Sequence, residues 1–307
     1  MIPNYLYPPD DRAPSMNKAW LEQLKRLRAY GIGVLPTQDG SDASLNRRRT
    51  TCEILHNSFA IDMNRPVLTL AARSMNYSFL AAEALWILAG DDRVETIAPY
   101  SSRLVQYSDD GKTFFGAYGP PIVRQLPYVV RSLIRDQDSR QAVISVWRES
   151  PGPTKNPPCT IALSFSLRKG KLHAHLYLRS SDTWLGLPYD LFGMACVAAR
   201  VAAALYQDGM EEITLGNLYV VAASSHYYLD QNAAIDNVLR LHGTGIDAAE
   251  ESPTLDWSHA IKDWSIAEED LVHTRDKLVG RPVWLDVRPA WSYRKLELVP
   301  GFNQEET

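Results

Sequence analysis

Apolar side chains recur at helical spacing in four segments of the chain. These are residues 17–30, 77–90, 122–136 and 191–208, and the second is apolar on nearly every side except at Glu83. The last segment is rich in alanine and other small residues. Because positions three and four residues apart share one face of a helix, the pattern predicts four helices.

Strand-like patterns occupy much of the rest. In residues 172–179 apolar and polar side chains alternate strictly, as in a strand with one buried face. The turn 168–171 separates it from a second strand at 159–167, which predicts a hairpin. Helices on one side of a mostly antiparallel sheet, an α+β layer, fit this order better than βαβ alternation. Further strands are predicted at 51–62, 66–71, 142–147 and 214–222, with a terminal pair within 283–298.

The segments between these elements indicate loops. Residues 92–120 are polar, aromatic and dotted with glycine, which is typical of a loop region shaped for a ligand. Residues 241–262 are polar and are predicted to be a surface insertion. With no internal repeat and no linker that separates independent parts, residues 1–307 are predicted to form a single domain.

Composition and charge exclude several classes of protein. The chain is 45% hydrophobic and carries 32 Lys+Arg against 36 Asp+Glu, without long blocks of one sign. This composition excludes disordered, collagen-like and coiled-coil classes, and the even charge distribution argues against an extended surface that binds nucleic acid. Three cysteines are too few for a disulfide framework, which predicts a reducing, cytoplasmic setting. The amino terminus has no signal-peptide pattern, and no stretch approaches the roughly 20 apolar residues that cross a bilayer, so no membrane association is expected.

Two side chains suggest covalent or acid–base chemistry. Cys159 follows Pro157-Pro158 at the start of a strand, where a rigid loop presents the thiol. A lone cysteine is most often a small buried apolar residue, and a reactive one needs a nearby cation, which Arg179 on the next strand can supply. Glu83 lies within an apolar helix and is therefore ion-paired, protonated or functional.

Other polar groups suit an anionic ligand. Residues 179–190 mix cationic and acceptor side chains around a turn, although Asp190 alone would serve as the cap of the following helix. The guanidinium groups of Arg47–Arg49 and Arg140 suit a phosphate, while solvated surface charge is the plain alternative for each. No metal site is predicted, because metal or triad spacing is lacking at the pairs His173/His175 and Ser225/His226.

Linked motifs between Arg140 and Gln231 resemble the thymidylate synthase family. DSRQAVISVW, NPPCTIALSFSL, GKLHAHLYLRSSDTWLGLPYDLFGMA and SSHYYLDQ occur in the family's order and close to its spacing, and EALWIL around Glu83 and AYG at Tyr118 extend the match. The resemblance implies a thymidylate synthase-like α+β fold with a large, mostly antiparallel or mixed sheet. It also implies a homodimer formed through the face of that sheet.

The same resemblance implies a reaction. Cys159 would add to C6 of a pyrimidine nucleotide, after which C5 attacks the one-carbon unit of the co-substrate 5,10-methylenetetrahydrofolate. Glu83 matches a glutamate that works through ordered water in removal of the C5 proton. Tyr118 matches an active-site tyrosine.

Binding residues carry over from the motifs as well. Arg179 and Ser180 match phosphate ligands, and Arg140 matches an arginine that reaches the phosphate in the other subunit. One of Arg47–Arg49 matches the mobile phosphate arginine; Arg47 is favoured, and the choice among the three stays open. Asp182 matches an aspartate that holds the folate, and Gly186 is assigned to the same cofactor site. His226 and Tyr228 match residues that bind the sugar 3′-hydroxyl.

Asp190 departs from the family pattern, since thymidylate synthases have asparagine at its position. That amide accepts from N3–H of uracil and donates to O4, whereas cytosine presents an acceptor at N3 and a donor at N4. A carboxyl accepts from the amino group and, when protonated, donates to N3. The departure favours cytosine and the deoxycytidylate or cytidylate hydroxymethylase branch, although a mere helix cap would fit either base.

A second departure concerns the product. Thymidylate synthases place a tryptophan pair at positions that fall near Leu104 and Tyr107, and no tryptophan lies between Trp86 and Trp147. Without this indole wall, water can reach the transferred methylene and give a hydroxymethyl product. Further departures are Thr160 for a histidine, Gln141 for an arginine, Leu178 for a glutamine, Ala222-Ala223-Ser224 for Gly-Gly-Asp, and a carboxyl-terminal GFNQEET without an apolar tail.

The sequence therefore predicts a hydroxymethyltransferase acting on dCMP or CMP, with no polymeric nucleic acid as partner. Reductive methylation of dCMP or of dUMP is the alternative reaction. A nucleotide-binding relative without catalysis is the alternative class, which the joint presence of Cys159, Glu83 and Asp182 disfavours. The choice between ribose and deoxyribose stays open, as does the choice between phage DNA modification and an antibiotic pathway.

Overall fold

The protein is built on one mixed sheet with helices behind it. The computed structural model describes residues 12–35, 49–149, 152–242 and 251–276. The strand order is β1-β2-β7-β5-β4-β3, and β6 pairs with β7 off this path. β7 runs parallel to β5 and β6, and the other pairs are antiparallel, which confirms the α+β prediction. The strands are β1 (Ile32–Val34), β2 (Thr51–Asp62), β3 (Val143–Ser145), β4 (Thr160–Arg168), β5 (Lys171–Leu178), β6 (Ser181–Asp182) and β7 (Thr214–Tyr228).

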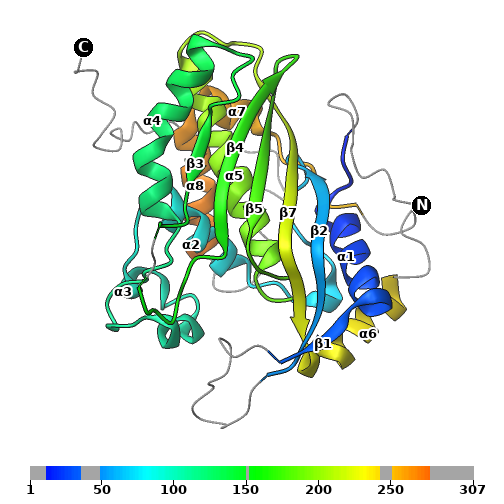
Figure 1. The fold of residues 1–307 in the computed structure, drawn as a ribbon. Helices are drawn as coiled ribbons and strands as arrows, with labels where there is room; N and C mark the ends of the chain where they lie inside the picture. Colours follow the sequence, from blue (N-terminus) through cyan, green and yellow to red (C-terminus); the bar gives the residue numbers. More distant parts are fainter. Residues whose placement is uncertain (1–11, 36–48, 150–151, 243–250, 277–307) are drawn as a thin grey trace.

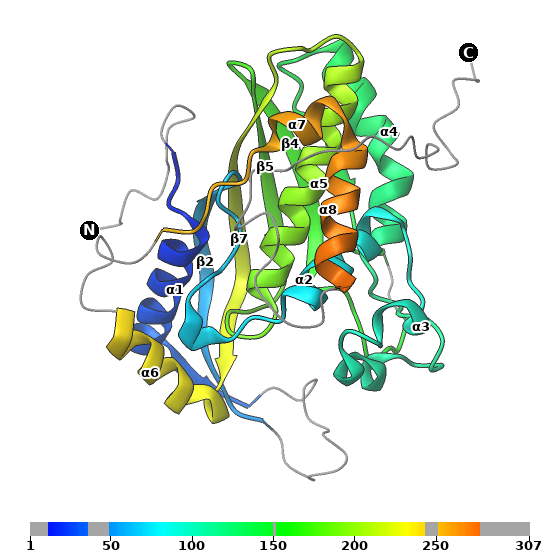
Figure 2. The ribbon, with the colours of Figure 1, turned by 180° about the vertical axis from the view of Figure 1, so that it is seen from behind.

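The helices lie mainly on one face of the sheet, as Figures 1 and 2 show from opposite sides. Helices α2, α5, α7 and α8 cover the central strands from behind, while α1 and α6 lie beside β2. The other face of the sheet is open toward the viewer in Figure 1. The helices are α1 (Met16–Tyr30), α2 (Tyr77–Leu88), α3 (Val94–Ile97), α4 (Gly119–Arg135), α5 (Leu187–Gln207), α6 (Asn232–His242), α7 (Trp257–Lys262) and α8 (Trp264–Asp276), with 3-10 turns η1 (Ala71–Arg73), η2 (Ser102–Tyr107) and η3 (Leu229–Gln231).

Helix α5 forms the centre of the core because its small side chains allow close packing on both the sheet and α2. A Cβ at Gly193 would stand 3.2 Å from Cδ1 of Ile87 on α2, so glycine permits this approach. Among the described residues α5 is the one helix long and apolar enough to cross a membrane, yet 78% of its apolar window is buried inside the protein. It is a core helix by its burial.

The predicted helices are confirmed with shifted ends. The largest shift is in α5, which begins at Leu187 rather than at residue 191. Pro188 lies in its first turn, where a missing N–H costs nothing and a fixed φ favours the helix. Asp190 therefore lies inside the first turn, and the N-cap is Gly186. The interpretation of Asp190 as a cap is wrong.

Two sequence predictions fail. Residues 66–71 form no strand, because Pro66 lacks a donor and the segment buries Val67, Leu68 and Leu70 by packing alone. The range 241–262 is not wholly a surface insertion, since it includes α7, whose Trp257 and Ile261 are buried. The predicted strand pair at 283–298 lies outside the described residues.

Strand β7 extends to Tyr228, well beyond the predicted end at residue 222. Its late part pairs with β6, so that Asp182 lies opposite His226. Parallel strands end at the same edge of a sheet, and here the ends of β5, β6 and β7 come together. This edge brings together Arg179, Ser180, Asp182, His226 and Tyr228, which were singled out from the sequence.

Candidate active site

Cys159 and Arg179 lie side by side where β4 begins and β5 has ended. The backbone N–H of Arg179 donates to the Cys159 carbonyl at 2.9 Å. The guanidinium donates to the Pro158 and Pro157 carbonyls, each at 2.9 Å, and its Nη2 lies 4.0 Å from the Cys159 Sγ. The proline-rich loop is thus fixed by the arginine that faces the sulfur. A cation in this place favours the nucleophilic thiolate.

Two carboxyl groups approach each other from α2 and α5. Burial, followed by the charge of Asp190, raises the pKa of Glu83 to about 8. Burial, followed by the charge of Asp182, raises the pKa of Asp190 to about 7. No hydrogen bond or ion pair to another described residue offsets either burial. Buried polar groups are normally satisfied, so two unsatisfied carboxyls on facing helices indicate a ligand site.

Tyr118 lies near both of these carboxyls and near the thiol of Cys159. It precedes α4 and its phenol is desolvated, which raises the pKa of Tyr118 well above its ordinary value. The charges of Asp190 and Cys159 act in the same direction, and that of Glu83 adds to them. The phenol therefore stays protonated and serves as a hydrogen-bond donor. Thr160, which replaces a histidine of the family, is fully buried next to Cys159.

Asp182 anchors the turn between β6 and α5. Its Oδ1 accepts from the N–H groups of Trp184 at 3.0 Å and Leu185 at 2.8 Å. Burial raises the pKa of Asp182, whereas the charge of His226 lowers it. Gly186 closes the turn, and a Cβ there would stand 3.7 Å from Oδ2 of Asp190. The turn thus sets Asp182 and Asp190 on one side of the site.

His226 and Tyr228 project from the end of β7. His226 is buried, and the two rings pack edge to face with centroids 5.7 Å apart. The sequence assigned these residues to the same part of the site, and the strand places them together. Ser180 lies between β5 and β6, directly after Arg179.

The arginine run enters the site through Arg49, which the sequence left as an alternative to Arg47. Its guanidinium lies 3.6 Å from the centroid of the Tyr228 ring, and its charge lowers the pKa of Asp182 against the larger effect of burial. The predicted phosphate ligand Arg47 lies outside the described residues. Arg49 directly precedes β2, whose pairing with β7 was the signal that could have identified it.

Arg140 lies far from the thiol of its own chain. In the register of β3 on β4, Val143 faces Ser164 and Ser145 faces Ala162. Continuing this register puts Arg140 near the level of Leu167, roughly 25 Å from Cys159 at about 3.3 Å per residue. Arg140 is exposed and is not part of the cluster described above.

Leu104 and Tyr107, where the sequence lacks tryptophan, lie on η2. Leu104 packs in a small apolar cluster with Phe79 and Phe114, and Tyr107 is 44% exposed. Trp86 lies edge-on to Phe114 with centroids 5.8 Å apart, and Trp147 lies under the guanidinium of Arg179 at 5.7 Å. Trp147 is therefore a neighbour of the site that sequence reasoning missed.

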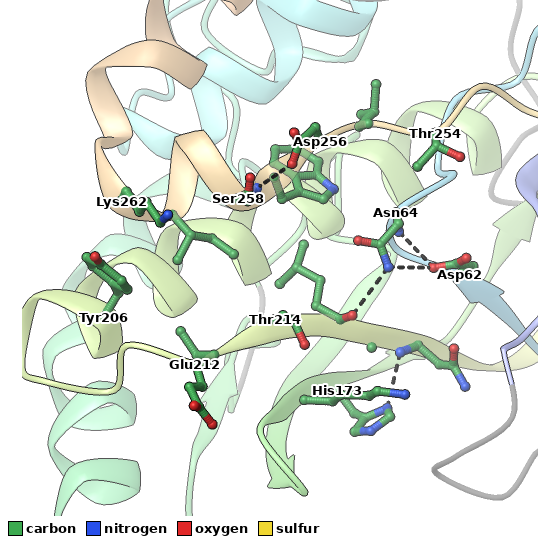
Figure 3. A pocket seen from close by; sticks show the side chains of 18 of the residues that line it. Asp62, Asn64, His173, Tyr206, Glu212, Thr214, Thr254, Asp256, Ser258 and Lys262 are labelled. Atoms are coloured by element: carbon green, nitrogen blue, oxygen red, sulfur yellow. Dashed lines mark hydrogen bonds between the residues drawn. The ribbon is translucent and has the colours of Figure 1, made fainter.

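A cavity of about 520 Å³ lies elsewhere, at the opposite ends of β5 and β7 from the thiol. Figure 3 shows Asp62 and Asn64 joined by hydrogen bonds on one side and His173 on another. None of the residues assigned to catalysis or binding from the sequence lines it. The residues singled out from the sequence therefore gather at the Cys159 edge and not at this cavity.

Comparisons with known proteins place the chain beside one family. The family model of thymidylate synthase matches residues 37–271. The chain is 31% identical to the deoxyuridylate hydroxymethyltransferase of Bacillus phage SP01 over 209 residues, covering 61% of this chain and 53% of that protein. It is 35% identical to the deoxyuridylate hydroxymethyltransferase of Pseudomonas phage M6 over 125 residues, covering 38% of this chain and 36% of that protein. The matches thus span about half, or less, of the length of these relatives.

Proposed function

Because this chain belongs to the thymidylate synthase family, we propose that it transfers a one-carbon unit to C5 of a pyrimidine nucleoside monophosphate and releases the 5-hydroxymethyl nucleotide. The proposed substrate is dCMP or CMP, and 5,10-methylenetetrahydrofolate supplies the carbon. The observation that carries the choice of base is Asp190, a buried carboxyl without a protein partner among the described residues. The two hydroxymethyltransferases to which the chain is similar support the reaction type.

The thiolate of Cys159 adds to C6 of the pyrimidine, which makes C5 nucleophilic. Arg179 supports this step because its Nη2 faces the sulfur while the proline carbonyls hold the guanidinium in place. The nucleotide phosphate is bound by the remaining donors of Arg179, with Ser180 next to it. Charge-assisted contacts of this kind fix the base over the thiol.

Glu83 is suited to move protons on and off the reacting base. With a pKa of about 8 it exchanges protons in both directions near neutral pH, as an efficient general acid–base group should. After carbon transfer the C5 proton leaves and the bond between the transferred carbon and N5 of the folate breaks, which releases tetrahydrofolate and leaves an exocyclic methylene at C5. Water adds to this methylene, and departure of the Cys159 thiolate from C6 releases the 5-hydroxymethyl nucleotide. The phenol of Tyr118 donates a hydrogen bond within the same cluster.

Asp190 is proposed to read the base. In its protonated form it donates to N3 of cytosine and accepts from the N4 amino group, so the carboxyl and the base form two complementary hydrogen bonds. The folate is proposed to lie against Asp182, whose Oδ1 is committed to the turn. Its other oxygen, Oδ2, accepts no hydrogen bond from the described residues and fits an N–H of the pterin.

dUMP is the second candidate substrate, because both similar phage proteins carry the name deoxyuridylate hydroxymethyltransferase. A neutral carboxyl also complements uracil when its two oxygens exchange roles, accepting from N3–H and donating to O4. An ionised carboxylate would repel O4. The protonation state of Asp190 therefore bears directly on the choice between the two bases.

Product analysis tests the proposal. The protein is incubated with methylenetetrahydrofolate and, separately, with dCMP, CMP or dUMP, and the product is identified by mass. We expect 5-hydroxymethyl-dCMP or 5-hydroxymethyl-CMP, and tetrahydrofolate as the released folate. Dihydrofolate appearing in step with product would contradict hydroxymethylation and support reductive methylation. Preferential turnover of dUMP would favour the second candidate.

A homodimer through the open sheet face is part of the proposal. The strands expose Val143, Ile161 and Tyr177, which are 40%, 39% and 41% exposed, on a sheet whose other face the helices cover (Figure 1). Apolar side chains gathered on one face are typical of an interface. Since Arg140 cannot reach the thiol of its own chain, its proposed role at a phosphate requires a second subunit.

Subunit complementation checks this arrangement. Arg140→Ala is expected to raise the KM for the nucleotide about tenfold through loss of a charge-assisted contact. At nucleotide concentrations well below KM, Arg140→Ala alone should give about a tenth of the wild-type rate and Cys159→Ser almost none. Refolding the two together should raise the rate to about a quarter of wild type, since half the dimers are mixed and each mixed dimer has one intact site. Refolding either variant alone is the control. Absence of any gain in mixed dimers would contradict a role for Arg140 in the partner's site.

A further inference from the structure

Arg49 is held on two sides by the protein. Its Nε donates to Oδ2 of Asp230 at 3.1 Å, and its Nη2 donates to Oδ1 and Oδ2 at 2.9 and 2.7 Å. The Cζ of the guanidinium lies over the Tyr228 ring, 3.6 Å from its centroid. Both contacts come from the end of β7 and the turn η3 that follows it. The carboxylate thus fixes one edge of the guanidinium and the ring fixes one face.

This arrangement leaves the second edge available. A guanidinium has five N–H donors in a planar fork, and Asp230 engages the edge formed by Nε and Nη2. The edge formed by Nη1 and Nη2 can therefore bind an oxyanion without breaking the pair. The charge of Arg49 also lowers the pKa of Asp182, so Arg49 acts electrostatically on a residue inside the site.

We propose that Asp230 is a positioning residue that orients Arg49 toward the 5′-phosphate of the nucleotide. Arg49, rather than Arg47, is then the phosphate ligand contributed by the arginine run. Tyr228 is the platform on which the guanidinium lies, and Asp230 prevents it from turning away. This inference rests on the proposed function only in that the ligand is a nucleoside monophosphate, whichever base it carries.

A structural role alone explains the pair poorly. The Arg49 and Asp230 side chains are 33% and 59% exposed, and exposed ion pairs contribute little to folding. A second exposed pair of the same kind, Arg28 with Asp236, offers a matched comparison, because it is also bidentate. Arg28 bonds to the hydroxyl of Tyr227 and lies between α1 and α6, away from the cluster around Cys159.

The test combines Asp230→Asn, Arg49→Ala and the double variant, with Asp236→Asn as control. Binding of dCMP, dUMP and the phosphate-free deoxynucleosides is measured by calorimetry, alongside kcat and KM. Asp230→Asn should raise the nucleotide dissociation constant and KM about three- to tenfold with kcat nearly unchanged. Neither Asp230→Asn nor Arg49→Ala should alter binding of the deoxynucleosides, which lack the phosphate. Asp236→Asn should leave all values at wild type.

The double variant decides whether Asp230 acts through Arg49. Residues that act as a unit are not additive, so the double variant should bind nucleotide no more weakly than Arg49→Ala alone. Additive losses, unchanged binding in Asp230→Asn, or equal weakening of the deoxynucleosides would overturn the proposal. Because the binding measurement needs no turnover and includes both bases, failure of the proposed reaction would not be mistaken for failure of this inference.

Discussion

Replacing Cys159 by serine is expected to lower the release of hydrogen from C5 of the nucleotide by at least about 10³-fold. A hydroxyl is a far weaker nucleophile than a thiolate near neutral pH, and loss of a covalent nucleophile typically removes most of the rate acceleration. Arg179 cannot compensate, because a guanidinium favours an anion only where the group ionises readily. The measurement is tritium release from the 5-tritiated nucleotide in the presence of the folate.

Nucleotide binding separates loss of the nucleophile from loss of the fold. Cys159→Ser should bind the nucleotide within a few-fold of wild type, since the phosphate and base contacts are retained. Cys52→Ser is the matched control, because this buried thiol donates to the carbonyl of Leu27 and lies outside the catalytic cluster. It should exchange C5 hydrogen at nearly the wild-type rate. Full exchange by Cys159→Ser would remove the proposed nucleophile.

Local patterns predicted the part of the site that lies on adjacent elements. The alternation of 172–179 and the turn before it define the β4–β5 hairpin, and this pairing alone brings Cys159 next to Arg179. Glu83 was conspicuous as a lone carboxylate in an apolar helix. It lies in the cluster because α2 packs directly on α5, which carries Asp190. Short-range spacing sufficed in these cases because one element pair determines each contact.

Long-range register accounts for what the sequence did not reveal. Arg49 and Asp230 are distant in the chain, and they meet only because β2 pairs along the full length of β7. A strand end predicted at residue 222 hid that extension, since the polar residues beyond it resemble a loop. Asp190 was ambiguous for another reason, because an aspartate near the start of a helix suits both a cap and a binding site.

Substituting Asp190 by asparagine is expected to shift the preference from dCMP toward dUMP. The ratio of kcat/KM for dCMP to that for dUMP should fall by at least about 10²-fold, because an asparagine oriented as in the thymidylate synthases accepts from N3–H and donates to O4, an order that suits uracil and opposes cytosine. Kinetics with both nucleotides measure the ratio. Asp208→Asn, at the exposed end of the same helix, should leave it unchanged. An unchanged ratio in Asp190→Asn would mean that another group reads the base.

The pH dependence of dCMP binding distinguishes a reading role from a passive one. Burial and the charge of Asp182 raise the pKa of Asp190 to about 7, so the donor needed for N3 is present below that pH and is lost above it. The dissociation constant for dCMP should therefore rise above about pH 7, approaching tenfold for each pH unit. Glu83, with a pKa of about 8, and the phenol of Tyr118, whose pKa is raised well above its ordinary value, face the same cluster and remain neutral at the start of this range.

Asp190→Asn isolates the contribution of this carboxyl. Wild type and variant share the titration of the nucleotide phosphate, whose second pKa is near 6, so the difference between their profiles removes it. The variant should show no loss of affinity through pH 7, and calorimetry between about pH 6 and 8.5 covers the required range. Parallel profiles would show that Asp190 does not donate to the base. A bend that persists in Asp190→Asn would instead assign the donor to another group of the cluster, such as Glu83.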